Sequence, residues 1–177
     1  MTTAEDVLHI YQLLADHNIP IWLTGGWGID ALLGEQTRPH KDLDVLLQLD
    51  DMVQMQGILA REGYHLKELW SENRGDTDSA GNEIATAFVL HDAEGREFDA
   101  HAIRLDADGN GLPAWEESAD FTIPKDDLSG VGTITGVAVQ CLTPEAQKRF
   151  HTGYELPEKH REDLRLLDEK FGLAYPD

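Results

Sequence analysis

The sequence is poor in cysteine and contains no long apolar run. Cys141 is the sole cysteine among 177 residues, which excludes an intrachain disulfide framework and favours a cytoplasmic protein with this thiol in its core. No apolar run approaches the roughly 18–20 residues of a membrane-spanning helix, and acids stand where a signal segment would be basic and apolar. We therefore expect neither a disulfide-built secreted domain nor a membrane protein.

Basic residues are also scarce. Fourteen Lys and Arg stand against 34 Asp and Glu, which gives a formal net charge of −20. Binding to nucleic acid requires clustered Lys and Arg, so we expect no nucleic-acid partner. The acidity attracts a cationic small molecule, although it serves solubility equally well. A hydrophobic share of 41% is ordinary for a folded globular chain and argues against disorder.

Local signals predict helices and strands in alternation near the N-terminus. Thr3 and Asp6 have the spacing of a capping box ahead of an amphipathic helix. Residues 21–23 indicate a buried strand, and residues 27–33 indicate a short helix that ends at Gly34. Such alternation is typical of a sheet flanked by helices.

The remaining chain changes to strands and then to helices. Residues 41–49 predict a strand, and Asp50 is placed to cap a helix that runs to about residue 62. We expect the last helix to bury Leu164, Leu167 and Phe171 and to end at Gly172. Further strands are predicted over residues 64–70, 84–91, 97–103, 121–123 and 137–142, with a hairpin turn over 92–96 and a helix that begins at Thr143-Pro144.

The most informative pattern is a glycine pair followed by two aspartates. Gly25 and Gly26 end an apolar strand, where a backbone without side chains can approach a phosphate closely. Asp42 and Asp44 alternate with apolar residues, so both point to one face of a strand, about 6–7 Å apart. Unpaired carboxylates on a buried strand are costly, and a divalent ion compensates them directly. The pattern indicates metal-dependent phosphoryl or nucleotidyl transfer, whereas surface acids on an edge strand are the alternative.

These motifs resemble the antibiotic nucleotidyltransferases. The similarity is carried by LTGGWGIDALLG at residues 23–34 and TRPHKDLD at residues 37–44. It continues in FDAH at residues 98–101 and FHTGYEL at residues 150–156, and so covers most of the chain. The sequence is most similar to the small lincosamide nucleotidyltransferases and next to the aminoglycoside 2''-nucleotidyltransferases.

The resemblance implies a fold and a chemistry. The fold would be α/β (α+β): a mixed twisted sheet flanked by helices, with a C-terminal helical portion over residues 143–177 that closes the cleft of a catalytic domain over 1–142. The enzyme would use ATP or another nucleoside triphosphate with one or two Mg²⁺ ions, and would transfer the nucleoside monophosphate, AMP above all, to a hydroxyl of a small antibiotic. Asp42 and Asp44 would hold the metal, and Asp99 would complete the acidic set as base, ligand or both. Gly25 and Gly26 would hold the triphosphate.

Several nearby residues admit two interpretations. Arg38 is a candidate phosphate ligand, with Asp30 and His40 orienting the site, but an Asp30–Arg38 pair that pins the loop is equally consistent. Lys159, with the adjacent His160, is a second phosphate candidate, although charged helix residues more often form a solvated face. His101 is more simply a hydrogen-bonded histidine of the sheet than a ligand.

Two further motifs suggest other functions. Residues 106–111, with Glu117 in the twelfth place, match a calcium loop, so a non-catalytic acidic calcium-binding module is an alternative. A strand is predicted before that loop where a helix is required. Residues 130–136 suggest a dinucleotide loop, but no helix pattern follows, and a hairpin is favoured.

If the protein is an enzyme, the resemblance implies a lincosamide as the acceptor, and an aminoglycoside is the alternative. We expect either a monomer or a homodimer.

Overall fold

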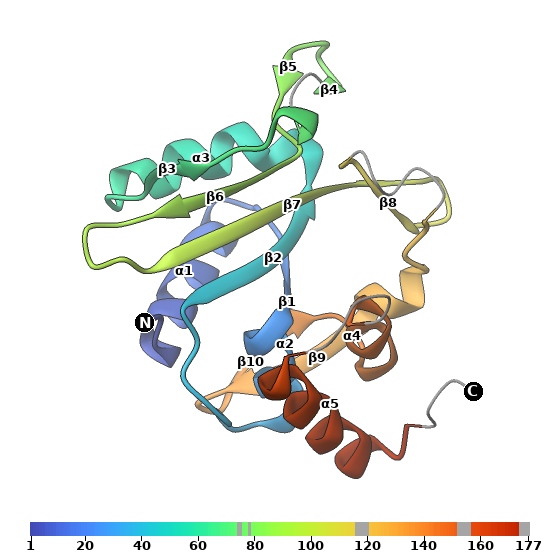
Figure 1. The fold of residues 1–177 in the computed structure, drawn as a ribbon. Helices are drawn as coiled ribbons and strands as arrows, with labels where there is room; N and C mark the ends of the chain where they lie inside the picture. Colours follow the sequence, from blue (N-terminus) through green and yellow to red (C-terminus); the bar gives the residue numbers. More distant parts are fainter. Residues whose placement is uncertain (74–75, 78, 116–120, 152–156, 174–177) are drawn as a thin grey trace.

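The protein is described here from a computed structural model that covers residues 1–73, 76–77, 79–115, 121–151 and 157–173 (Figure 1). The α-helices are α1 (Ala4–Asp16), α2 (Gly25–Leu33), α3 (Met52–Arg61), α4 (Pro144–Phe150) and α5 (Glu158–Phe171). Short 3-10 helices are η1 (Leu49–Asp51), η2 (Ser71–Asn73) and η4 (Lys125–Ser129). The strands are β1 (Ile21–Thr24), β2 (Asp42–Gln48), β3 (His65–Glu68), β4 (Asp76–Thr77), β5 (Glu83–Ile84), β6 (Ala87–His91), β7 (Glu97–Leu105), β8 (Gly111–Pro113), β9 (Gly130–Ile134) and β10 (Val137–Cys141).

One mixed sheet organises the molecule. Its strand order is β3-β6-β7-β2-β1-β10-β9, and β8 pairs with β7 at one end. The pairs β2–β7 and β1–β10 are parallel, whereas β1–β2, β6–β7 and β9–β10 are antiparallel. This confirms the expected α/β fold with a mixed sheet. The parallel register places Asp44 beside Asp99 on the central strands.

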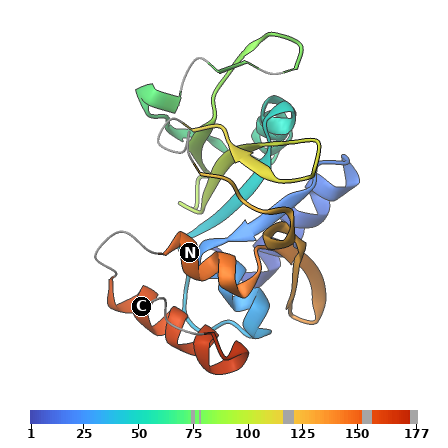
Figure 2. The same cartoon turned by 90° about the vertical axis from the view of Figure 1, so that its right-hand side faces the viewer.

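The two faces of the sheet differ in how much apolar surface they bury. On β2, Leu43, Val45 and Leu47 are fully buried and belong to the main core, together with apolar residues of α1, α2 and α3. The alternate residues of β2 face the other way, where Leu46 joins a smaller cluster that includes Trp22 and is bordered by Trp115 and Phe150. Helices α1 and α3 lie on one side of the sheet, and α5 lies at its lower end (Figure 2). The second face is therefore left partly open.

Helix ends follow the local signals. Both halves of the capping box form at Thr3 and Asp6, and Gly34 and Gly172 end α2 and α5 in the left-handed conformation. Thr143 caps α4 through its side chain. The predicted hairpin turns at 92–96 and between β9 and β10 are also present.

Three local predictions were wrong. Asp50 does not cap α3, because it lies within the 3-10 helix η1. Its Oδ1 instead accepts a hydrogen bond from the backbone amide of Ser79, 2.8 Å away. Residues 121–123 form no strand and make only an isolated bridge between Ile123 and Gly111. Phe171 is 40% exposed, whereas Leu164 and Leu167 of the same helix are buried as expected. At Asp50 and Ile123 a tertiary contact replaces the expected local structure.

The two C-terminal helices, α4 and α5, pack against α2 near the N-terminus of the chain. Both therefore contact the helix that begins with the glycine pair. The division into residues 1–142 and 143–177 stays a prediction. Within the described residues, no helix is both long and apolar enough to cross a bilayer. Cys141 is buried in β10, as expected for a core thiol.

Candidate active site

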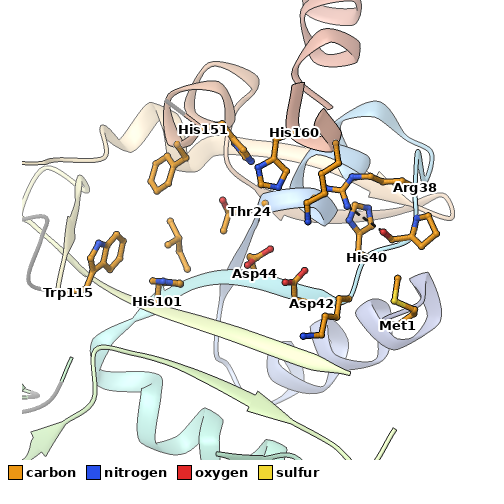
Figure 3. Close-up of a pocket in the computed structure, with 17 residues that line it drawn as sticks. Met1, Thr24, Arg38, His40, Asp42, Asp44, His101, Trp115, His151 and His160 are labelled. Atoms are coloured by element: carbon orange, nitrogen blue, oxygen red, sulfur yellow. Dashed lines mark hydrogen bonds between the residues drawn. The ribbon is translucent and has the colours of Figure 1, made fainter. Parts of the chain in front are cut away.

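A cavity of about 760 Å³ opens on the second face of the sheet. Its wall combines strand β2, the start of α2, the loop before β2, and residues of α4 and α5 (Figure 3). The predicted residues that line it are Gly25, Gly26, Arg38, His40, Asp42, Asp44, His101, Lys159 and His160. Residues that are far apart in the sequence thus meet in one place.

The two aspartates of β2 lie at the centre of this cavity. Asp42, Asp44 and Leu46 alternate with buried residues and all line it, as the strand period of two requires. Asp99 is the parallel register partner of Asp44. Asp99 does not line the cavity, but its Oδ1 lies 3.5 Å from Nδ1 of His101, which does line it.

The electrostatics of these carboxylates favour a bound cation. Burial, followed by the charges of Asp42 and Asp99, holds the pKa of Asp44 well above its usual range. Burial also raises the pKa of Asp99, against the lowering effect of His101. Among the described side chains, Asp99 Oδ1 is one of three buried polar atoms without a hydrogen-bond partner. Clustered carboxylates with an orphaned oxygen are the donor set that a hard divalent ion requires.

The described residues form no preformed metal cage. In the described part of the chain, no three His, Cys, Asp or Glu side chains converge closely enough to hold an ion by themselves. Asp42 and Asp44 are therefore the immediate candidate ligands. Asp99 is a neighbouring third carboxylate, and its role stays a prediction. The residues fit a metal whose coordination is completed by a bound substrate, as is usual for Mg²⁺.

The glycine pair begins α2 and fits against the site closely. Gly25 has φ 59°, and a Cβ there would lie 2.2 Å from Asp44 Oδ2. A Cβ at Gly26 would lie 2.2 Å from His40 Nδ1. The preceding Thr24 makes no side-chain cap, which leaves the first N–H groups of α2 available to an anion. The glycines thus serve the approach of Asp44 and His40 as well as that of a ligand.

The loop before β2 is held at two points. Asp30 accepts hydrogen bonds from the amide and hydroxyl of Thr37, and its Oδ2 lies 2.5 Å from His40 Nε2. Arg38 instead forms a bidentate pair with Asp163 of α5, with Nη2 2.6 Å from Oδ2. The alternative interpretation, an Asp30–Arg38 pair that pins the loop, was therefore wrong, because each residue has another partner. The orienting role expected of Asp30 and His40 agrees with their contact.

The start of α5 also reaches the cavity. Lys159 and His160 both line it, and the positive charge of Lys159 lowers the pKa of Asp44 against the other effects. Burial, with the charges of His151 and Lys159, lowers the pKa of His160. The solvated-face interpretation of this helix start is incomplete, since the exposed Lys159 also lines the cavity. Of the C-terminal motif at 150–156, residues 152–156 lie outside the described residues.

The two ends of the cavity differ in chemistry (Figure 3). The charged end consists of Arg38, His40, Lys41 and Lys159. The aromatic end consists of Leu46, His101, Trp115 and Phe150. Asp42 and Asp44 lie between the labelled residues of the two ends (Figure 3).

The aromatic end was not predicted from the sequence. His101 lies edge-on to Trp115, with ring centroids 5.2 Å apart, so it faces the cavity rather than serving only the sheet. Phe150 is packed edge-on against Phe121. Trp115 follows a short strand in a polar stretch, and its sequence neighbours give no signal of a binding surface.

The two alternative motifs lose their support. The loop at 106–111 joins β7 to β8 rather than two helices, and the carboxylate of Asp106 already accepts hydrogen bonds from Asp108 and Asn110. Glu117 lies outside the described residues. The glycines at 130–136 form the β9–β10 hairpin. The calcium-module alternative therefore has no geometric basis in the described residues.

A glycine turn at a helix start that faces paired strand carboxylates, within a mixed sheet, places the protein among the nucleotidyltransferases. The chain belongs to the aminoglycoside-2''-adenylyltransferase family, whose model matches residues 6–167. It is accordingly an enzyme of the antibiotic nucleotidyltransferase kind, with a nucleoside triphosphate as co-substrate.

Individual relatives agree with this assignment. A lincosamide resistance protein of Staphylococcus haemolyticus is 28% identical over 165 residues, which are 93% of this chain and 94% of the relative. The crystal structure of the lincosamide antibiotic adenylyltransferase LnuA with bound lincomycin has a TM-score of 0.79 and 28% identity, and covers 94% of this chain and 97% of that one. ANT(2")-Ia with adenylyl-2"-tobramycin shares the fold, with a TM-score of 0.71 at 23% identity, over 97% of this chain and 91% of that one.

Proposed function

We propose that the protein transfers AMP from ATP to a hydroxyl group of a lincosamide antibiotic and thereby confers resistance. The observation that carries this proposal is the cavity itself, in which Asp42 and Asp44 separate a charged end from an aromatic end. A triphosphate requires the first kind of surface, and an acceptor with apolar groups suits the second.

The charged end would bind the triphosphate. Gly25 and Gly26 present backbone N–H groups at the start of α2, and Arg38 and Lys159 supply positive charge. These local donors let a protein of net charge −20 attract an anion. They support the predicted roles of all four residues.

Asp42 and Asp44 would hold Mg²⁺, with Asp99 as a further ligand if a second ion binds. When bound, the ion neutralises phosphate charge and stabilises the attacking and leaving oxygens. Asp99 is carried on the central strand β7, so its direction is fixed by the sheet rather than by a loop. That rigidity suits a group that must accept a proton at a defined position.

The reaction balances with these groups. The acceptor hydroxyl oxygen attacks the α-phosphorus of ATP, and its proton passes to the Asp99 carboxylate. The bond between the α-phosphorus and the oxygen that bridges the α- and β-phosphates breaks. Pyrophosphate leaves with that electron pair, and AMP remains on the acceptor. Because the reaction consumes ATP, we assign the activity to the cytoplasm, with small molecules rather than nucleic acid as partners.

A lincosamide is the acceptor that the aromatic end favours. A lincosamide joins a sugar to an alkylated amino acid, and Trp115, Phe150 and Leu46 offer apolar surface to such groups. A lincosamide resistance protein and a lincosamide adenylyltransferase are each 28% identical to this chain over 93–94% of its length, whereas ANT(2")-Ia covers 97% of it at 23% identity.

An aminoglycoside is the second candidate, supported by the name of the matching family and by the net charge of −20, which attracts a polycation. The test is incubation of the protein with ATP, Mg²⁺ and a panel of both antibiotic classes, read by mass spectrometry, with Asp44→Asn and a chelator as controls. A metal-dependent adenylyl adduct on lincosamides is expected. An adduct on aminoglycosides alone would overturn the acceptor, and no adduct on either class would overturn the proposed activity.

A further inference from the structure

Asp163 is a buried carboxylate that accepts hydrogen bonds from Arg38, a side chain of the cavity. It lies on α5 and is 2% exposed. Arg38 Nε donates to its Oδ1 at 3.0 Å, and Arg38 Nη2 donates to its Oδ2 at 2.6 Å. Within the described part of the chain, Asp163 accepts hydrogen bonds from no other residue. A bidentate pair of this kind fixes the plane of a guanidinium as well as its position.

The fixed guanidinium lies over the glycine turn. Arg38 Nη2 is 3.1 Å from the point where a Cβ of Gly26 would stand, and Arg38 lines the cavity. A guanidinium has five N–H donors, of which Asp163 takes the Nε donor and one Nη2 donor. Nη1 makes one long contact of 3.4 Å to the Pro39 carbonyl. Donors therefore remain for an anion at the start of α2.

The same helix brings another cation to the cavity. Lys159 and His160 lie one turn before Asp163, at the spacing that puts residues on one helix face. Helix α5 thus supplies one lining cation and holds a second, Arg38, which comes from a loop 125 residues earlier. The Thr37 and His40 contacts to Asp30 anchor that loop to α2 but leave the guanidinium of Arg38 to Asp163.

We propose that Asp163 is a positioning residue that orients Arg38 toward the triphosphate, so that nucleotide affinity depends on the contact between α5 and the loop before β2. This inference rests on the proposed nucleotide site at the charged end. The competing account is that the pair only joins two parts of the fold.

The chain offers a matched control for that competing account. Asp168, on the same helix, pairs with Lys148 at 2.7 Å, and the two side chains are 13% and 9% exposed. That pair also joins α5 to another helix, but neither residue lines the cavity. Asp168→Asn therefore removes a comparable buried carboxylate without touching Arg38.

The experiment measures, by calorimetry, binding of Mg²⁺ with a non-hydrolysable ATP analogue to wild type, Asp163→Asn, Asp168→Asn, Arg38→Ala and the Arg38→Ala/Asp163→Asn double variant. We expect Asp163→Asn to weaken binding by about tenfold or more, as loss of a charge-assisted orientation would. In a protein that already carries Arg38→Ala, Asp163→Asn should cause no further loss of affinity for the analogue. Asp168→Asn should lower the melting temperature but leave that affinity unchanged.

Unchanged affinity in Asp163→Asn, equal losses in both backgrounds, or an equal loss in Asp168→Asn would overturn the inference while leaving the proposed function intact. Absence of analogue binding by wild type would overturn the proposed nucleotide site as well. If Asp163→Asn does not fold, Asp163→Glu decides, because it keeps the charge but shifts the guanidinium. That variant should raise KM for ATP several-fold with the acceptor KM unchanged, and an unchanged ATP KM would overturn the inference.

Discussion

The charged end and the aromatic end of the cavity hold their side chains by different means. At the charged end, hydrogen bonds to buried carboxylates fix the polar groups: Arg38 is held by Asp163, and His40 by Asp30. At the aromatic end, rings rest edge-on against one another, as Trp115 does on His101. The first arrangement fixes direction, whereas the second fixes mainly surface.

This difference matches what each end would bind. A triphosphate presents the same charges in every turnover, and directed donors recognise it with high specificity. Acceptors vary in shape, and aromatic surface tolerates variation because apolar contact is not directional. The comparison therefore predicts that substitutions at the two ends separate into effects on nucleotide and effects on acceptor, whereas substitutions between them affect turnover itself.

The largest effect is expected for the carboxylates between the two ends. Asp42→Asn and Asp44→Asn keep side-chain shape but remove the charge that would hold the metal, which supplies several kcal/mol of transition-state stabilisation. Turnover at saturating Mg²⁺ should fall by about 10³-fold or more. Asp50→Asn, in the exposed 3-10 turn after the same strand, should retain nearly full activity. Full activity of Asp44→Asn would show that this position is not at the reacting centre.

A smaller but still large effect is expected at Asp99. An Asn there accepts no proton as a carboxylate does, so kcat should fall by about 10²–10⁴-fold. If Asp99 is the base, calorimetry should find that Asp99→Asn binds Mg²⁺ and the ATP analogue like wild type. If it is chiefly a ligand, that binding weakens together with the rate. Unchanged turnover would contradict both assignments.

The two ends also differ in how far the sequence predicts them. Gly26, His40 and Asp44 lie within twenty residues, and a glycine turn before an alternating strand indicates their meeting by local rules. Helix ends at Gly34 and Gly172 were likewise predictable, because a cap depends on its immediate neighbours.

Long-range contacts were not predictable. The Arg38–Asp163 pair spans 125 residues, and an Asp within a charged helix resembles any solvated acid until the tertiary fold buries it. Trp115 and Phe150 meet at the aromatic end only because β8 and α4 bring them against the same cluster. Trp115 carries no periodic or motif signal, and the motif that begins at Phe150 does not indicate which surface Phe150 lines, so the acceptor side of the site required the structure.

Trp115→Ala tests whether the aromatic end binds the acceptor independently of the nucleotide. Removing this ring deletes apolar surface from the aromatic end, so KM for the acceptor should rise by about tenfold, close to 1.4 kcal/mol. KM for ATP should stay within about twofold of wild type, since no group of the charged end is changed. Lys159→Gln should show the reverse pattern. Trp70→Ala, a partly exposed tryptophan outside the cavity, is the control and should change neither constant. Parallel changes in both KM values would refute the division into two ends.

The smallest effect concerns stability of the free protein. Burial and the charges of Asp42 and Asp99 raise the pKa of Asp44 in the folded state. A raised folded pKa means that the folded protein holds this proton more tightly than the unfolded chain, whose Asp titrates near 3.9. Stability is therefore lost as the pH rises from about 4 through the folded pKa, and above that range Asp44 lowers the free energy of unfolding.

Asp44→Asn removes this titrating group and its cost, so the metal-free variant should melt above the metal-free wild type at pH 7. A gain of about 1 kcal/mol corresponds to about 2–4 °C for a chain of this size. The difference should shrink toward pH 4, where the wild-type carboxyl is protonated. Added Mg²⁺ with the ATP analogue should reverse the order, because a ligand that binds only the folded wild type stabilises it by mass action. A variant that melts below wild type at pH 7 without metal would mean that Asp44 is held by a favourable partner, and the carboxylates between the two ends would then be structural rather than poised for a cation.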